Sequence, residues 1–260
     1  MATTKVVKNA APKTSTAVAR AKINLPVDVN AQMAAEVAEI QKRISAPSGD
    51  RIAVTQAKTF RLSNGLEVDE FEGIVVEFVA ANYHYENPFD RDNIEAPKCF
   101  SISLEPATMV PSANSPEVQA GACSACWANQ FKSAGKGKAC QNTRLLAILP
   151  MDADADTPIS ILKVSPTAIK AFDAHVASVA RKYNKPVRAV TTKFTMSDEE
   201  YASVRFTDMG LAPSDLVLVA NDRKAEATTR LMVEPDVAAS VDGNKVSPKK
   251  PAPRKPIIKR

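Results

Sequence analysis

Four cysteines constrain this chain more than any other feature, because three of them fall within the 22-residue stretch "CSACWANQFKSAGKGKACQNTR". Cys123 and Cys126 form a C-x2-C pair, Cys140 follows after 13 further residues, and Cys99 precedes the pair. Two thiolates at this spacing can bind one ion from a tight turn, and structural Zn²⁺ takes four ligands in a tetrahedron. The spacing predicts one structural zinc ion bound by all four cysteines.

Two other interpretations of the cysteines stay open from the residues alone. The cysteines could pair as two disulfides, although nothing in the sequence suggests secretion. They could also be four unrelated thiols, although their clustering within 42 positions argues against it. A catalytic zinc is disfavoured, because such sites keep a position for water and commonly use histidine. The only two histidines, His84 and His175, are expected to be structural or solvent-facing.

The order of predicted elements indicates a mainly β fold with helices (α+β). Apolar runs predict strands over residues 71–86, 99–104, 144–150, 159–164, 187–196 and 201–206. Apolar spacing of three and four residues predicts a helix over 166–183 and a final helix over 213–232. The order is three or four strands, one helix and then two strands. It fits a five-stranded OB-like barrel, in which a helix follows the third strand, here with a zinc loop inserted at 99–140.

Two sets of side chains should face the core of this barrel. In the helix at 166–183 they are spaced three or four residues apart, and in the strand at 99–104 they are spaced two apart. The helix set is Ile169, Phe172, Val176 and Val179, and the strand set is Phe100, Ile102 and Leu104.

Charge is distributed unevenly along the chain, which has a formal net charge of +5. Residues 1–27 carry +5 and residues 244–260 carry +7, neither with any acid, which leaves −7 for residues 28–243. Basicity therefore belongs to the ends, and the middle of the chain is mildly acidic.

The same patterns suggest a domain organisation. Low hydrophobicity and like charges predict basic disordered tails over 1–27 and 236–260, the second rich in proline. Apolar spacing predicts an amphipathic helix over 28–45, and the OB-like domain should occupy 51–235. No apolar run could span a bilayer and the start lacks a signal-peptide core, so we expect no membrane partner. A transit peptide is the formal alternative for the acid-free start.

Longer motifs resemble a family of phage proteins. The shared pattern is a cysteine just before a strand, then C-x2-C-x2-N-x-[FW], then G-K-G-K-A-C-x-N-x-R, flanked by "NYHYENPFDRDNIEAPKCF" and "VSPTAIKAFDAHV". The resemblance covers roughly residues 50–235 and implies a phage gene and a zinc-bearing β domain. A looser similarity to phage single-stranded-DNA-binding proteins implies an OB barrel. Two departures from them are the basic C-terminal tail and the acidic middle.

Single-strand binding requires a cationic track and aromatic faces for base stacking. The candidate residues are Tyr83, Tyr85, Trp127, Phe131, Lys132, Lys136, Lys138, Arg144, Lys163, Arg188, Lys193 and Arg205. The structural alternative is that Trp127 and Phe131 cover the metal site and that Tyr83 lies in the core.

These features together predict a sequence-tolerant single-stranded-DNA-binding protein of phage replication or recombination. It would act in the cytoplasm of the infected bacterial host, with other phage replication proteins as further partners. The alternative is a non-enzymatic structural or adaptor protein of a phage assembly, whose basic tails contact nucleic acid or an acidic partner.

We expect no enzyme and no small-molecule substrate. The acids of "MDADAD" (Asp152, Asp154 and Asp156) are typical of a solvated loop rather than of a nuclease site. The stretch "GKGKAC" lacks phosphate-loop spacing.

Overall fold

The computed structural model describes residues 51–88, 90 and 95–237, together with Val29 and Gln32. The chain divides into two units, Met1–Pro47 and Ser48–Arg260, and the fold below is that of the second. The predicted tails and the predicted helix at 28–45 lie outside the described residues, apart from residues 29, 32, 236 and 237.

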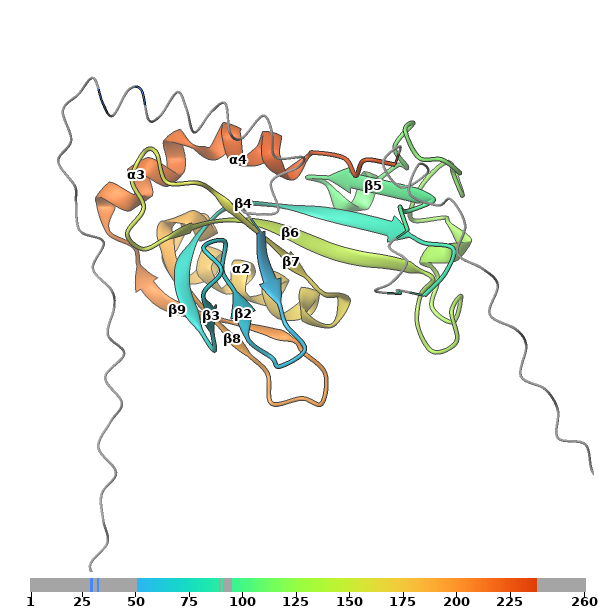
Figure 1. Cartoon of the computed structure of the whole chain (residues 1–260), viewed down its shortest axis with the longest axis horizontal. Helices are drawn as coiled ribbons and strands as arrows, with labels where there is room; N and C mark the ends of the chain where they lie inside the picture. Colours follow the sequence, from blue (N-terminus) through green and yellow to red (C-terminus); the bar gives the residue numbers. More distant parts are fainter. Residues whose placement is uncertain (1–28, 30–31, 33–50, 89, 91–94, 238–260) are drawn as a thin grey trace, which may run out of the picture. The chain divides into compact units, whose positions relative to one another are not determined.

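One curled sheet forms the framework of the second unit, with nine strands among the described residues (Figure 1). In chain order the strands are β1 (Arg51–Val54), β2 (Phe60–Arg61), β3 (Glu67–Val68), β4 (Phe71–His84), β5 (Cys99–Ser103), β6 (Cys140–Pro150), β7 (Ser160–Val164), β8 (Val190–Met196) and β9 (Val204–Leu211). Their order across the sheet is β3-β2-β1-β7-β6-β4-β8-β9, and β5 pairs with β4. The β1–β7 pair is parallel and the other pairs are antiparallel.

The two long central strands, β4 and β6, are buried on both faces over much of their length. Val75 and Leu146 belong to a core on the side of helix α2 (Ile169–Tyr183). Ile74 and Leu145 belong to a second core, which helices α3 (Ser214–Asp222) and α4 (Lys224–Leu231) cover from the other side (Figure 1). Burial on both faces explains why these strands read as near-continuous apolar runs.

The prediction of a mainly β fold with helices is confirmed, and so is the helix predicted at 166–183. It appears as α2, preceded by a 3-10 turn at Pro166–Ala168. Phe172 and Val179 are buried and Val176 packs against the same core, whereas Ile169 is only partly buried.

The structure corrects three details of the predicted fold. Among the described residues the sheet has nine strands instead of five, and no pairing joins β3 to β9, so the described sheet is open rather than a closed barrel. Leu104 lies just beyond the end of β5 and is 54% exposed, while Phe100 and Ile102 do pack in the core. The predicted final helix is broken at Arg223 into α3 and α4.

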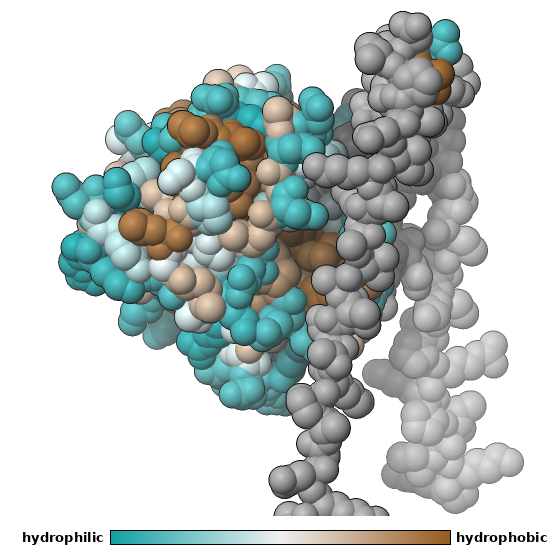
Figure 2. Space-filling model, turned by 90° about the vertical axis from the view of Figure 1, so that its left-hand side faces the viewer, coloured by the Kyte–Doolittle hydropathy of each residue, from teal (hydrophilic) through white to brown (hydrophobic). Residues whose placement is uncertain are grey.

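The surface shown in Figure 2 is mostly hydrophilic, with hydrophobic residues in small separate groups. Large exposed apolar side chains of the described chain include Met209, Leu211 and Leu218. Scattered residues of this kind are normal on folded proteins. No helix among the described residues has the length and apolar character needed to cross a membrane.

Gly73 occupies a crowded position, because β4 is paired on both edges there, with Pro150 and with Thr192. A Cβ atom added to Gly73 would lie 2.8 Å from the carbonyl oxygen of Leu149, so the backbone would have to shift. We expect Gly73→Ala to lower the free energy of unfolding by about 1–3 kcal/mol in denaturant titrations. Gly121→Ala is the control, because a Cβ atom added to Gly121 would have no neighbouring atom within 4 Å. Equal losses in the two variants would contradict this account.

Candidate metal centre and its surface

Cys99 and Cys140 lie on either side of His84, at the end of β4. β5 and β6 flank β4, and in this register Cys99 and Cys140 both lie opposite His84. Directly opposite residues of neighbouring strands share a face of the sheet. Both thiols therefore lie on the face that carries Asn82 and His84.

The loop between β5 and β6 supplies the other two cysteines from a tight turn. The amide N–H of Cys123 donates to the carbonyl oxygen of Met109 at 3.0 Å, and that of Cys126 donates to the carbonyl oxygen of Cys123 at 3.4 Å. The side-chain amide of Asn129 donates to the same Cys123 oxygen at 2.8 Å. The asparagine of the C-x2-C-x2-N pattern thus has a local role, which is to close the turn.

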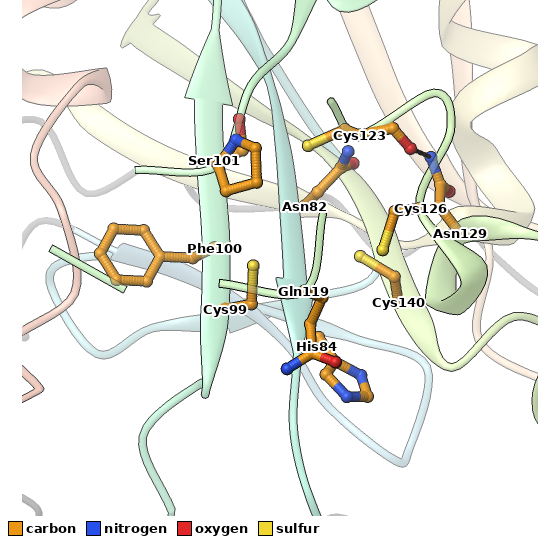
Figure 3. Close-up of a pocket in the computed structure, with 11 residues that line it drawn as sticks. Asn82, His84, Cys99, Phe100, Ser101, Gln119, Cys123, Cys126, Asn129 and Cys140 are labelled. Carbon is orange, nitrogen blue, oxygen red and sulfur yellow. Dashed lines mark hydrogen bonds between the residues drawn. The ribbon is translucent and has the colours of Figure 1, made fainter. Parts of the chain in front are cut away.

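All four cysteines line one pocket, and Figure 3 shows their sulfur atoms turned into it from both strands and the loop. The cavity measures about 20 Å³, on a scale where one water needs about 10–15 Å³. The four cysteines are free thiols, so the two-disulfide alternative does not describe this structure, and all four line the same pocket.

The side chains as they stand do not form a finished metal site. Among the described residues, no group of three or more His, Cys, Asp or Glu side chains has the arrangement needed to hold an ion. The zinc ion therefore stays a prediction.

The electrostatics of the pocket favour neutral thiols in the absence of a cation. Burial, followed by the neighbouring Cys123, Cys126 and Cys99, raises the pKa of Cys140 to about 12. Burial also raises the pKa of Cys123, against hydrogen bonds from Ser101 and Asn82 that lower it. Thiolates are the form that binds a metal, so an ion here would have to displace the protons.

The outer side of the cysteine loop exposes two aromatic rings, Trp127 at 53% and Phe131 at 78%. The Trp127 indole N–H donates to Gln119 at 3.1 Å, and its ring meets His84 edge to face at 5.4 Å. The Lys138 ammonium lies 5.2 Å from the centroid of Phe131.

The segment that carries these rings also contains three lysines and no acid. Lys132 and Lys136 are exposed, and the sequence contains no Asp or Glu between Glu117 and Asp152. We call the following five residues the loop surface: Trp127, Phe131, Lys132, Lys136 and Lys138.

The predicted residues Tyr83, Tyr85 and Lys163 form a separate group. Tyr83 is only 9% exposed and belongs to the core under α3 and α4, on the opposite face of the sheet from the cysteines. The Lys163 ammonium lies 4.7 Å from the centroid of the Tyr83 ring, and Tyr85 is partly buried beside it. Tyr83 is therefore not free to stack a base.

The remaining predicted cations have partners elsewhere in the fold. Arg144 pairs with Asp173 at 3.0 Å. The other three interactions are Lys193 with Glu70 at 2.7 Å, Arg205 with Glu199 at 3.6 Å, and Arg188 with Asn221 at 2.6 Å. These residues do not join the loop surface in one cationic track.

Sequence reasoning missed the position of His84. It lines the cysteine pocket, with its Nδ1 atom 3.4 Å from the Ala139 carbonyl oxygen. His175 is buried and hydrogen-bonded to Thr192 at 3.0 Å, which fits the structural role expected for it. Only the strand register, with a cysteine opposite His84 on each side, could have indicated its place.

Comparison with known proteins gives no relative: no family model, no curated protein and no solved structure matches this chain. The resemblance to phage proteins therefore stays a prediction.

Proposed function

We propose that this protein binds single-stranded DNA without sequence preference, and that the loop surface makes the contact. The observation that carries the proposal is the exposure of Trp127 and Phe131 on a segment, residues 118–151, that contains three lysines and an arginine but no acid. Stacking of a base on an aromatic ring contributes about 1–3 kcal/mol and tolerates any base. A duplex hides its base faces, so this surface favours single strands.

We also propose that one Zn²⁺ ion, bound by Cys99, Cys123, Cys126 and Cys140, holds the loop in place. Four free thiols around a cavity of about 20 Å³ support this assignment. Zinc–sulfur distances of about 2.3 Å would require the four cysteine side chains that line this pocket to converge on one point. Four thiolates would fill the coordination sphere, so the proposed ion is structural rather than catalytic.

The biological setting of the proposal rests on the sequence resemblance alone. It comprises phage replication or recombination, the cytoplasm of the infected bacterium, and partnership with other replication proteins. The proposed contact with DNA does not depend on a closed OB-like barrel. An open curled sheet can present the same loop.

One observation favours a second candidate, a non-enzymatic adaptor of a phage assembly. Residues 51–237 carry a net charge of −4, whereas the two ends of the chain are strongly basic. In an adaptor of this kind, nucleic acid or an acidic partner would contact only the ends.

A salt titration with the full chain and with a chain lacking residues 244–260 separates the two candidates. We expect the deletion to lower the slope of log affinity against log salt by several units at most, since each phosphate contact contributes about 0.7–0.9. The preference for a single-stranded oligonucleotide over the matching duplex should persist in the shortened chain. Loss of all binding at low salt would instead favour the adaptor.

A further inference from the structure

A second group of polar residues lies on the other face of the sheet, where β1 and β7 run parallel. Arg51 pairs with Ile161 in the register of these strands, and Lys163 is two residues further along β7. Arg51, Ile161 and Lys163 therefore share a face. Lys163 reaches over the Tyr83 ring at 4.7 Å, and the Tyr83 and Tyr85 ring centroids are 6.5 Å apart.

The two cations in this group have no counterion in the part of the chain that the structure describes. Arg51 and Lys163 differ in this from Arg144 and Lys193, which form ion pairs there. Burial lowers the pKa of Lys163, and the nearby Arg51 charge lowers it further. Arg51 and Lys163 are both exposed, so an anion can reach them, and a bound anion would offset the repulsion between these two like charges.

The tyrosines add hydrogen-bond donors to the charges. Burial, followed by the neighbouring Tyr85, raises the pKa of Tyr83 to about 12, and burial raises the pKa of Tyr85. Both phenols therefore keep their O–H groups at neutral pH. A guanidinium can contact two oxygens of one phosphate, an ammonium adds a point charge, and phenol hydroxyls can donate to the same oxygens.

We propose that Arg51, Lys163, Tyr83 and Tyr85 form a phosphate-binding site. The inference rests on the proposed function, because the phosphate would be a phosphodiester group of the same DNA strand that contacts the loop surface. The simpler alternative is that Lys163 only lays its aliphatic chain and charge over the Tyr83 ring.

The first test compares two double variants of the full chain that lose the same charge. Arg51→Gln with Lys163→Gln removes the proposed site, and Lys170→Gln with Arg181→Gln removes two cations from α2, which covers the other face. We expect the first pair to weaken binding of a single-stranded oligonucleotide about tenfold at low salt and to reduce the salt slope by about one unit. The control pair should leave the slope unchanged. Equal slopes in both pairs would overturn the site.

The second test works even for a chain that binds no DNA. Inorganic phosphate added to the full chain should shift the NMR signals of the Arg51 Nε–H group and of the backbone amides at 161–163. The Arg51→Gln, Lys163→Gln variant should lose the amide shifts. If the chain binds no oligonucleotide, the proposed function fails, and this titration alone decides the site. Absence of any shift in the full chain would then overturn it.

Discussion

Cys126→Ser should abolish stoichiometric zinc binding and lower the melting temperature by about 10 °C or more. A serine hydroxyl does not replace a thiolate ligand, and structural zinc contributes directly to folding, with apparent binding free energies of about 10–16 kcal/mol in small zinc-binding peptides. Loss of only part of this free energy would account for the expected fall in melting temperature, because 1 kcal/mol shifts the melting temperature of a domain this size by about 2–4 °C.

The loop between β5 and β6 has little buried apolar contact with the sheet. That contact is a small cluster of Ala80, Met109 and Cys123, and the first half of the loop is otherwise held by polar contacts, such as the bonds of Ser112 and Glu117 to the β5 side. We therefore expect hydrogen exchange to quicken first in this loop and in β5. The core under α2 should keep its protection, since regions with few buried contacts open at lower free energy.

Metal analysis, thermal melting and hydrogen exchange of the purified full chain check this prediction. Ser124→Ala is the matched control, since Ser124 lies in the same turn with an exposed side chain that lines no part of the pocket. It should retain zinc and melt like the wild type. A wild-type chain purified without chelator that contains no zinc would contradict the assignment.

The sequence predicted best those elements whose patterns are long. β4 is a long, near-continuous apolar run, and α2 has apolar residues spaced three and four apart over many residues, so both could be recognised. β2 and β3 have two residues each, too few for any period, and they form because they pair with β1 and with each other. The open order of the sheet depends on such long-range pairings, which a single sequence does not reveal.

The candidate site also combines features that the sequence predicts with features that depend on long-range pairing. The C-x2-C turn could be predicted because its residues are neighbours in the chain. The approach of Cys99 to Cys140 across His84 depends on strand register. The pairing of Arg144 with Asp173 depends on how α2 packs, so the sequence alone could not show that this arginine already has a partner.

Phe131→Ala should weaken binding of a single-stranded oligonucleotide by about 1–3 kcal/mol, or roughly 5- to 150-fold, if a base stacks on this ring. The ring is 78% exposed, so its removal should leave the zinc content and the melting temperature unchanged. Trp127→Ala should cost a similar amount, and the two losses together should exceed about 30-fold if they add. The salt slope should stay constant in each variant, because no phosphate contact is lost.

Trp127 is the only tryptophan in the chain, so its fluorescence reports on this surface directly. Binding of a single strand should quench it in the wild type, and in Phe131→Ala the quenching should require a higher oligonucleotide concentration. Tyr201→Ala is the control, since Tyr201 is an aromatic residue with 52% exposure outside the loop surface, and it should bind like the wild type. If Phe131→Ala and Trp127→Ala both bind with wild-type affinity, and DNA does not quench the wild-type fluorescence, the loop is not the contact surface. The basic ends would then be the remaining candidates for DNA binding, as the adaptor function requires.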